Sequence, residues 1–352
     1  MGSARAEAPY TPASGLLWSS PVSRPHAITD QLAKLVRATP SGEIIRANIY
    51  RLGVRSLVDA FEAAFKRGVT VEIILNHNSI GEYPASKELA DLLNADKHDD
   101  SWVRKAHGST RNGADGSIDH QKSYTFSRVG NATNVVVLGS NNPTRDADQH
   151  AYSLMWQLVG ASKLYAEVNR IFAIQAELDH HGHRSAIVAH GSWWKLYDLP
   201  TRPRDARHDP VMHLLKHIPA NSGTHLRIAM FAFWSRRGDW ITDRLVTMAH
   251  RGVHIDLLVG PSVAGSIQGR LRRAGANVYV GHWGRGRHMQ FVHSKDWSVS
   301  YLHHGKRVRW TFVGSDNWAA GSLINDEATL GVRSYRYFKK FGAYFQRARH
   351  HR

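Results

Sequence analysis

Two segments of the chain share one pattern of apolar and polar positions. Residues 57–76 (LVDAFEAAFKRGVTVEIILN) and 241–260 (ITDRLVTMAHRGVHIDLLVG) each place apolar side chains at helical spacing, followed by Arg-Gly-Val and a short apolar run. A glycine that follows a basic helix end is typical of a helix C-terminus. The apolar run has little polar content, which predicts a buried and parallel strand. Each segment therefore predicts a helix and then a strand.

The repeat extends on both sides of these segments. A further strand candidate precedes each one, at 43–52 and 225–234. After each one come a loop, a strand with His-x-Lys, and an apolar strand that ends in Gly-Ser-x-Asn, at 118–142 and 291–317. The lysine-to-glycine separations are 17 and 19 residues, so the two halves run nearly in register. This doubled order predicts an α/β fold of two pseudo-twofold-related lobes, each a mixed, mostly parallel β-sheet flanked by helices.

The domain organisation follows from the same pattern. The density of proline and charge in 193–210 suits a surface crossing between the lobes. We expect a flexible N-terminal segment (1–25), an N-terminal lobe (26–180), a linker (181–222), a C-terminal lobe (223–346) and a basic tail (347–352).

The charge of the chain narrows the choice of partner. Its 352 residues include 46 Lys and Arg against 29 Asp and Glu, a net charge of +17. Such a surface attracts nucleic acid, anionic lipid or a phosphorylated substrate. Cysteine is absent, which excludes disulfides, a thiolate nucleophile and a cysteine-based zinc site. No apolar stretch approaches the roughly 20 residues of a membrane span.

The two His-x-Lys strands predict one active site built by both halves. Residues two apart on a strand point to the same face, so His120 projects with Lys122 and His293 with Lys295. If the halves face each other, two imidazoles and two ammonium groups meet in one pocket. The lysines can neutralise a phosphodiester, one imidazole can attack phosphorus, and the other can protonate the leaving oxygen and then activate water. This chemistry requires no metal and no other cofactor.

Further residues are expected around that pocket. The Gly-Ser-x-Asn elements add hydrogen-bonding groups, namely Ser140, Asn142, Ser315 and Asn317. Glycine- and arginine-rich loops at 104–117 and 281–290 directly precede the two His-x-Lys strands and are expected to rim the site. In the second loop Trp283, Arg285 and Arg287 are candidates for binding substrate, with ordinary packing or a solvated loop as the alternative.

At these residues the sequence resembles the phospholipase D superfamily, over roughly 30–340. The signature of that superfamily is His-x-Lys, an aspartate and Gly-Ser-x-Asn, present twice in bilobal members. This chain departs from it, because Ser127 and Ser300 stand at the aspartate positions and the spacing to Gly-Ser is longer. The resemblance implies metal-free transfer through a covalent phosphohistidine, with His120 as the nucleophile and His293 as the general acid and base.

The superfamily often carries an acidic residue after Gly-Ser-x-Asn that orients a histidine. In the second copy the resemblance implies Glu327, with Asp326 as the alternative. In the first copy Asp146 or Asp148 is the candidate.

The preferred function is a phosphodiester hydrolase that releases the head group of a phospholipid. The alternatives are a nuclease of the same fold, which cuts DNA or RNA, and a non-catalytic relative that binds polyanions. An anionic membrane surface is a second expected partner, and a monomer suffices to build the site. The polar start MGSARAEAPYTPASG fits a mature chain whose signal peptide has been removed, so we expect a secreted protein. The histidines of 180–184 lack the helical spacing of a zinc site and are expected in a solvated loop.

Overall fold

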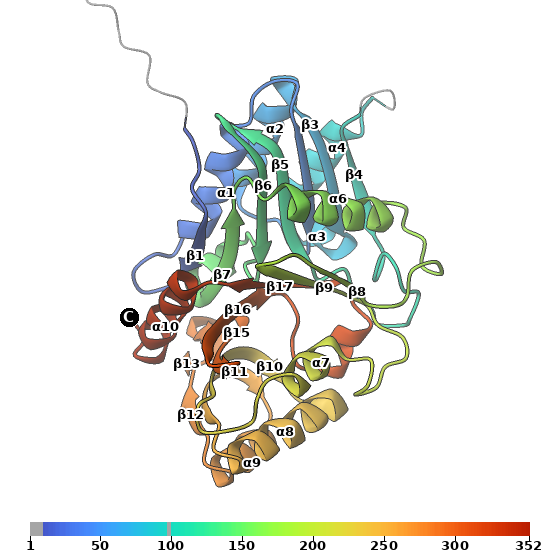
Figure 1. The fold of residues 1–352 in the computed structure, drawn as a ribbon. Coiled ribbons are helices and arrows are strands. Elements are labelled where there is room, and N and C mark those ends of the chain that lie inside the picture. The colour runs from blue at the N-terminus through green and yellow to red at the C-terminus, as the bar shows by residue number, and fades with distance from the viewer. Residues whose placement is uncertain (1–9, 97–99) are drawn as a thin grey trace, which may run out of the picture.

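Two β-sheets with helices packed on them form the two lobes of the protein, as Figure 1 shows. The computed structural model describes residues 10–96 and 100–352. The first lobe consists of β1 (Gly15–Ser19), α1 (Ala27–Arg37), β2 (Ile44–Ile49), α2 (Arg55–Lys66), β3 (Thr70–Asn76), α3 (His77–Glu82), α4 (Pro84–Leu93), β4 (Trp102–Ala106), β5 (Lys122–Val129), β6 (Ala132–Gly139), α5 (Arg145–His150), β7 (Ala151–Leu158) and α6 (Ser162–Ala176).

The second lobe repeats most of this order. It consists of β8 (Ile187–His190), β9 (Trp194–Leu199), α7 (Pro210–Lys216), β10 (His225–Phe233), α8 (Ser235–His250), β11 (His254–Val263), α9 (Gly265–Arg273), β12 (Asn277–Val280), β13 (His282–Trp283), the 3-10 helix η1 (Gly286–His288), β14 (Gln290–Val292), β15 (Lys295–His303), β16 (Lys306–Gly314), the 3-10 helix η2 (Ala320–Leu323), β17 (Glu327–Arg333) and α10 (Tyr335–Arg349).

Both sheets are mixed, which confirms the predicted two-lobed α/β fold. Strands β2, β3 and β4 are parallel, as are β10, β11 and β12. On the other side of β2 and β10 the neighbouring strands run antiparallel, through β5–β6–β7 and β15–β16–β17–β9–β8. The predicted helix–strand pairs are α2–β3 and α8–β11. Gly68 and Gly252 follow the two helices at φ +84° and +89°, a conformation that glycine adopts without strain.

The repeat begins earlier in each half than the sequence pattern indicated. Strand β1 pairs with β7 and precedes α1, just as β9 pairs with β17 and precedes α7. The segment 1–25 is therefore not simply a flexible lead, although residues 1–9 lie outside the described part. Residues 181–222, expected as a linker, contain β8, β9 and α7 and complete the second sheet.

The prolines that indicated a linker have a different physical role. Pro210 is the first residue of α7, and the side chain of Asp209 caps that helix by accepting from the N–H of Val211 at 3.0 Å. A proline in the first helical turn is favourable, because the N–H that it lacks would have no helical partner there. The tail 347–352 also differs from expectation, since α10 extends to Arg349 and Ala348 is fully buried.

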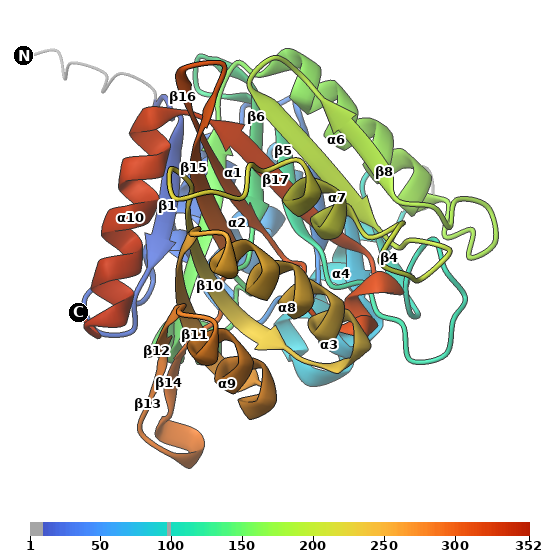
Figure 2. The ribbon, with the colours of Figure 1, turned by 60° about the horizontal axis from the view of Figure 1, so that its bottom comes forward.

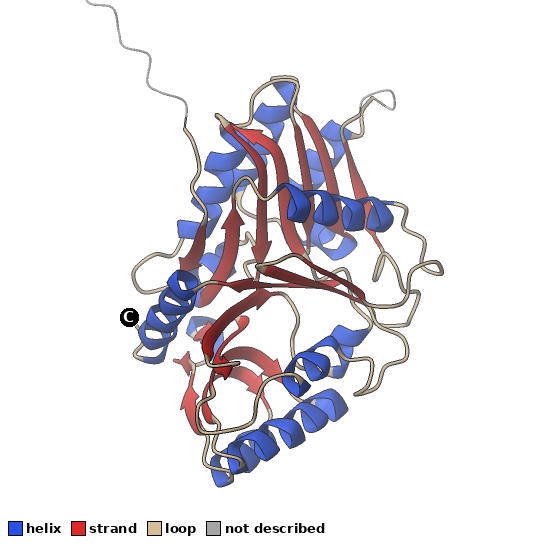
Figure 3. Cartoon of the chain, in the orientation of Figure 1, coloured by secondary structure: helices blue, strands red, loops and turns tan. Residues whose placement is uncertain are grey.

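A shared core joins the two lobes. Helices α1, α2 and α4 cover one face of the first sheet, and α7, α8 and α9 cover one face of the second (Figure 3). Between the lobes, β6 and β7 pack with β9, β17 and α10 around side chains such as Trp156, Leu330 and Phe345. Strand β14 of the second half, which is labelled in Figure 2, adds to the first sheet. It pairs in parallel with β7. The shared core and the pairing of β14 with β7 fix the two halves of the candidate site relative to each other.

Candidate active site

The two His-x-Lys pairs lie where β5 and β15 begin, at the junction of the lobes. The backbone N–H of His120 donates to the carbonyl of Asp326 at 3.0 Å, and that of His293 donates to the carbonyl of Tyr152 at 2.9 Å. Each histidine is therefore held by the strand of the opposite lobe. His120 is 7% exposed and His293 is 9% exposed, while both lysines are fully buried.

The charges of the four groups act on one another. Burial lowers the pKa of His120 well below its usual value, and the ammonium groups of Lys122 and Lys295 lower it further. Burial and the same two lysines also lower the pKa of His293. Each imidazole thus senses the lysine of the other lobe. The structure brings the four side chains into one electrostatic unit, as the doubled motif predicted.

Two aromatic rings line this unit, and sequence reasoning missed both. The ring of Tyr50 lies 4.7 Å from that of His120, and Nζ of Lys122 lies 4.8 Å from the centre of the Tyr50 ring. Tyr50 directly follows β2, where its N–H donates to the carbonyl of Gln121 at 3.0 Å. Aligning the repeat could have found Tyr50, but an aromatic residue in a strand usually indicates ordinary packing.

Phe231 takes the matching place in the second lobe. Its ring lies 4.9 Å from that of His293, and Nζ of Lys295 lies 4.9 Å from its centre. Its N–H donates to the carbonyl of Ser294 at 2.8 Å, as that of Tyr50 does to Gln121. An aromatic face beside a buried ammonium group is a favourable neighbour for the cation. Each lysine of the site thus has an aromatic ring, and not a carboxylate, as the neighbour of its ammonium group.

The ammonium group of each lysine donates a hydrogen bond to the backbone carbonyl of the histidine two residues before it. Nζ of Lys295 donates to the carbonyl of His293 at 2.7 Å and lies 2.9 Å from Nε2 of the same histidine. Nζ of Lys122 donates to the carbonyl of His120. Burial lowers the pKa of Lys122 to about 7, against the opposing charges of Glu327 and Asp119. A bound anion would reverse that shift, because it favours the charged ammonium.

Glu327 is the acidic partner of His120. Its carboxylate oxygens lie 2.8 and 3.0 Å from Nδ1 of His120. Burial raises the pKa of Glu327 to about 7, and the charge of Lys122 works in the opposite direction. A carboxyl group at Nδ1 fixes the ring and keeps the lone pair of the neutral imidazole on Nε2. The geometry at His120 therefore suits a nucleophile.

His293 has a different partner, which breaks the symmetry of the site. Its Nδ1 lies 3.0 Å from the carbonyl oxygen of Ser140. The N–H of Ser140 donates to the carbonyl of Leu154 as that of Ser315 donates to Ala328, so Ser153 matches Glu327 in register. A neutral serine thus stands where the other lobe has a carboxylate.

The first-copy candidates Asp146 and Asp148 are bonded to residues other than His120 and His293. Oδ1 of Asp146 lies 3.1 Å from Nδ1 of His150 on the surface. Asp148 is buried but accepts from Thr29 at 2.8 Å and lies 3.2 Å from Nδ1 of His26. Helix α5 inserts at this point and turns both carboxylates away, which a comparison of linear spacing does not reveal.

The Gly-Ser-x-Asn elements have two separate roles. Oγ of Ser140 is bonded to the backbone of Leu154, and Oγ of Ser315 accepts from the N–H of Ala328 at 3.1 Å. These serines fix the strands that follow. The side-chain carbonyl oxygens of Asn142 and Asn317 are buried and have no hydrogen-bond partner among the described residues. A phosphate would be contacted by the NH₂ groups of these amides, because their oxygens can only accept hydrogen bonds.

The motif positions that carry Ser127 and Ser300 are structural. Oγ of Ser127 donates to Glu43 at 2.7 Å and accepts from the N–H of Ile44 at 2.8 Å, so it anchors the start of β2. Ser300 lies on β15 opposite His225 and is 8% exposed. A buried carboxylate is supplied instead by Asp296, next to Lys295, whose Oδ1 accepts from the N–H of Gly314 at 3.1 Å.

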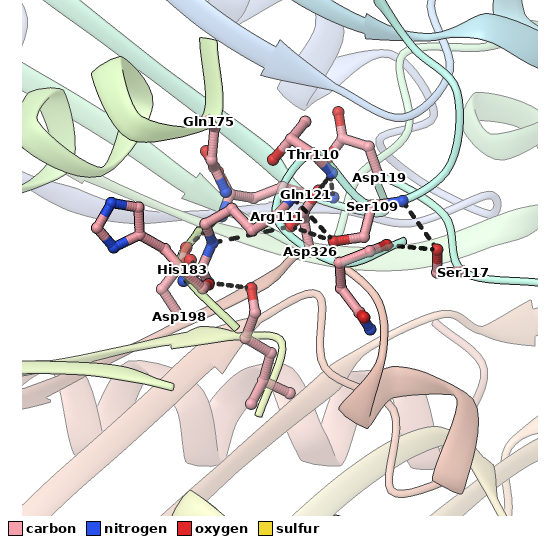
Figure 4. Close-up of polar contacts among 12 residues, drawn as sticks. Ser109, Thr110, Arg111, Ser117, Asp119, Gln121, Gln175, His183, Asp198 and Asp326 are labelled. Atoms are coloured by element: carbon pink, nitrogen blue, oxygen red, sulfur yellow. Dashed lines mark hydrogen bonds and ion pairs between the residues drawn. The ribbon is translucent and has the colours of Figure 1, made fainter. Parts of the chain in front are cut away.

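A buried polar network clamps the loop 104–117 onto the second lobe (Figure 4). Arg111 is fully buried and donates to the carboxylate of Asp198 and the carbonyl of Leu199. Asp326 accepts from Oγ of Ser109 at 2.8 Å and from the N–H of Thr110. Asp326 is thus engaged by the loop, which leaves Glu327 alone to orient His120.

The second loop places its predicted residues farther from this chemistry. Trp283 stacks on His351, with ring centres 4.2 Å apart, and packs against Tyr152 at 5.5 Å. Arg285 and Arg287 are exposed, and neither forms an ion pair with a residue that the structure describes. No hydrogen bond joins these side chains to the His-x-Lys pairs within the described ranges. Their role in substrate binding stays a prediction.

The described residues offer neither a metal site nor a membrane-spanning helix. Within residues 10–96 and 100–352, no group of three or more His, Asp or Glu side chains is arranged to hold a metal ion, the loop 180–184 included. In the same ranges no helix has both the length and the apolar character that a bilayer span requires.

Comparison with known proteins identifies the family. A family model described as "Cardiolipin synthase, PLD-like domain" matches residues 34–175 and 215–349, which is well over half of the chain. The chain therefore belongs to the phospholipase D superfamily, as its doubled motif predicted. No curated protein sequence matches it significantly.

Solved structures share the fold at low identity. Polyphosphate kinase from Porphyromonas gingivalis aligns with a TM-score of 0.64 and 14% identity over 96% of this chain, which spans 50% of that protein. Phosphatidylserine synthase from Haemophilus influenzae aligns with a TM-score of 0.61 and 10% identity, over 93% of this chain and 85% of the other. Yeast tyrosyl-DNA phosphodiesterase follows at 0.50 and 12%, over 92% and 89%.

Proposed function

We propose that the protein is a metal-free phosphodiesterase that cleaves its substrate in two steps through a phosphohistidine. The observation that carries this proposal is the asymmetric pair of histidines. His120 has the carboxyl group of Glu327 on Nδ1, and His293 has only the carbonyl of Ser140. Two imidazoles with different partners suit two different roles at one phosphorus atom.

In the first step Nε2 of His120 attacks phosphorus and the bond to the leaving oxygen breaks. His293, protonated once the anionic substrate has entered, gives its proton to that oxygen. Lys122 and Lys295 carry the charge on the non-bridging oxygens. Burial lowers the pKa values of both lysines, so both gain from a bound phosphate.

In the second step His293, now neutral, takes a proton from water, and the resulting oxygen attacks the phosphohistidine. The P–N bond breaks, and the electron pair returns to Nε2 of His120. Glu327 stabilises the positive charge that His120 carries while it is phosphorylated. Asn142 and Asn317 supply hydrogen bonds to the phosphate. Both His-x-Lys pairs come from one chain, so we expect a monomer to be active.

For the substrate we propose a phospholipid that loses its head group, at an anionic membrane surface. The family description and the structural likeness to a phosphatidylserine synthase support a lipid. The nuclease alternative is supported by the net charge of +17 and by the likeness to a tyrosyl-DNA phosphodiesterase. The non-catalytic alternative is disfavoured because both His-x-Lys pairs are present. Trp283, Arg285 and Arg287 remain candidates for substrate contact, and secretion stays a prediction.

A substrate panel in EDTA tests the proposal. The protein is incubated with phospholipid vesicles of several head groups, with single-stranded DNA and with RNA, and product release is measured. We expect release of a lipid head group that needs no metal. Cleavage of nucleic acid alone would discard the lipid substrate, and loss of every activity on chelation would discard the metal-free mechanism.

A further inference from the structure

A cationic pocket lies between β1 and α10, outside the active site. Its volume is about 280 Å³, and Trp18 of β1 lines it together with Arg24, Lys340 and Arg347. Figures 1 and 2 both show α10 alongside β1. None of the lining residues belongs to the His-x-Lys pairs or their partners, and no Asp or Glu is among them.

The three cations have no counter-charge. Arg24, Lys340 and Arg347 are exposed, and none of them forms an ion pair or side-chain hydrogen bond with a residue that the structure describes. Some other surface arginines are paired: Arg55 bonds Asp59 at 2.6 Å, and Arg270 bonds Asp239 at 3.3 Å. Gathering three unpaired positive charges around one cavity costs free energy through mutual repulsion. An anion in the cavity would remove that cost.

Trp18 organises the arginines around the cavity. Cζ of Arg24 lies 4.6 Å from the ring centre of Trp18, and Cζ of Arg347 lies 5.6 Å from it. Tyr344 lines the cavity as well, and its ring lies 6.4 Å from that of Trp18. Contacts between an arginine and an indole ring restrict the guanidinium, so less freedom is lost when the arginine binds a ligand.

We propose that this pocket binds a phosphate group, either of a free phosphate ester or of a lipid head group. The guanidinium groups of Arg24 and Arg347 match phosphate oxygens in geometry, and Lys340 adds a point charge. The indole of Trp18 offers an apolar side to the organic part of the ligand. The volume lies near the lower end of ligand pockets, which suits a small group such as a glycerol phosphate.

Tyr344, which lines the pocket, also contacts the chain just before β15, the strand that carries Lys295. The hydroxyl of Tyr344 lies 2.6 Å from Oγ of Ser294, which stands between His293 and Lys295 in the chain. A ligand that contacts Tyr344 thus touches the side chain that supports the start of β15. The proposal does not depend on the proposed hydrolase activity, because it concerns different residues and a different ligand-binding event.

Calorimetric titration with glycerol 3-phosphate tests the pocket at low salt. The wild type is compared with the double variant Arg24→Ala/Arg347→Ala and with Lys339→Ala, which removes one exposed charge from the same helix. We expect the wild type and Lys339→Ala to bind glycerol 3-phosphate in this pocket with the same affinity. In the double variant this binding weakens about 100-fold or more, since each charged hydrogen bond contributes about tenfold or more.

No binding of glycerol 3-phosphate by the wild type, or equal binding by the wild type and the double variant, overturns the proposal. The arginines are exposed, so the double variant is expected to keep the melting temperature of the wild type. A crystal soaked in tungstate, a heavy phosphate mimic, provides a measurement that needs no variant. Its anomalous signal is expected between Trp18 and Lys340, and a signal in the active site alone contradicts the pocket.

Vesicles distinguish the two sources of the phosphate group. Co-sedimentation with phosphatidic acid vesicles that is lost in the double variant and kept in Lys339→Ala identifies a lipid head group. Binding of soluble glycerol 3-phosphate without such co-sedimentation identifies a free ester. Equal loss of co-sedimentation in both variants would indicate general attraction to a charged surface and would count against a built site.

Discussion

The carboxylate of Glu327 lies 2.8 Å from Nδ1 of His120, although 207 residues separate them in the chain. The pair crosses the boundary between the lobes, and the backbone hydrogen bond from His120 to Asp326 runs beside it. The second lobe therefore completes the proposed nucleophile of the first. The reverse does not hold, because Ser153 stands in the matching position for His293.

Substitution of Glu327 is expected to impair turnover far more than substitution of its counterpart. Glu327→Gln keeps the shape but removes the charge that stabilises a phosphorylated His120, so we expect kcat to fall about 10²- to 10⁴-fold. Ser153→Ala is the matched control and should leave kcat within about twofold, since His293 is held by a backbone carbonyl. Steady-state kinetics check both variants. Equal losses would contradict the assigned asymmetry.

Removal of a catalytic lysine is expected to separate activity from stability. Lys122→Met should lower kcat/KM about 10²- to 10³-fold, because one group that stabilises the transition state is lost. The melting temperature should not fall, since burial already lowers the pKa of this lysine to about 7 and makes its charge costly inside the protein. Lys87→Met, on the exposed face of α4, is the control. A large loss of stability would indicate a structural lysine instead.

The loop clamp is expected to be a stability element. Arg111→Met leaves the buried carboxylate of Asp198 without its cation, and Asp326 loses a nearby positive charge. We expect a loss of about 3–5 kcal/mol in the free energy of unfolding. Denaturant titration measures it, with exposed Arg202→Met as the control. A change of less than about 0.5 kcal/mol in the free energy of unfolding would show that the Arg111 network does not stabilise the fold.

The buried carboxyl of Asp296 gives a pH signature. Burial raises its pKa from 3.8 to about 7, so between these values the folded state binds a proton that the unfolded state has lost. This group therefore makes stability fall as pH rises from about 4 to 7, by at most about 1.4 kcal/mol per pH unit. Asp296→Asn should lack this slope and become progressively more stable than the wild type up to pH 7.

Melting temperatures at several pH values test the Asp296 signature. Asparagine keeps an oxygen that can accept from the N–H of Gly314, so the variant is expected to match the wild type below about pH 4. Parallel curves for the two proteins from pH 4 to 7 would show that this carboxyl does not titrate as proposed.

Features that repeat in the sequence could be predicted well. The helix–strand pairs and the His-x-Lys strands follow local periodicity, and two copies in the same order predicted that they meet. These signals are local, so the chain carries them without knowledge of the fold. Glu327 follows instead from the resemblance to the phospholipase D superfamily, which often carries an acidic residue after Gly-Ser-x-Asn.

Features that depend on long-range pairing could not be predicted in this way. Strand β1 has only five residues, and its partner β7 lies near the end of the first lobe in the sequence. No local pattern therefore marks β1 as part of the sheet. Because α5 is inserted, the side chain of Asp148 contacts Thr29 of α1 and does not reach the site. Ser153 then takes the position that matches Glu327. Arg111 belongs to a Gly- and Arg-rich loop that is expected at the rim of the site, yet its partner Asp198 lies in the other lobe.

The central claim is that His120 becomes phosphorylated during turnover. The most direct measurement uses His293→Asn, in which hydrolysis of the intermediate should be slow. The substrate is a p-nitrophenyl ester, whose leaving group needs no acid, and its retained phosphate carries ³²P. After a base quench and digestion, mass spectrometry locates the label. The account predicts a phosphopeptide that contains His120, formed equally well in EDTA. A label on any other residue in the wild type or the variant, or turnover without any labelled intermediate, would contradict it.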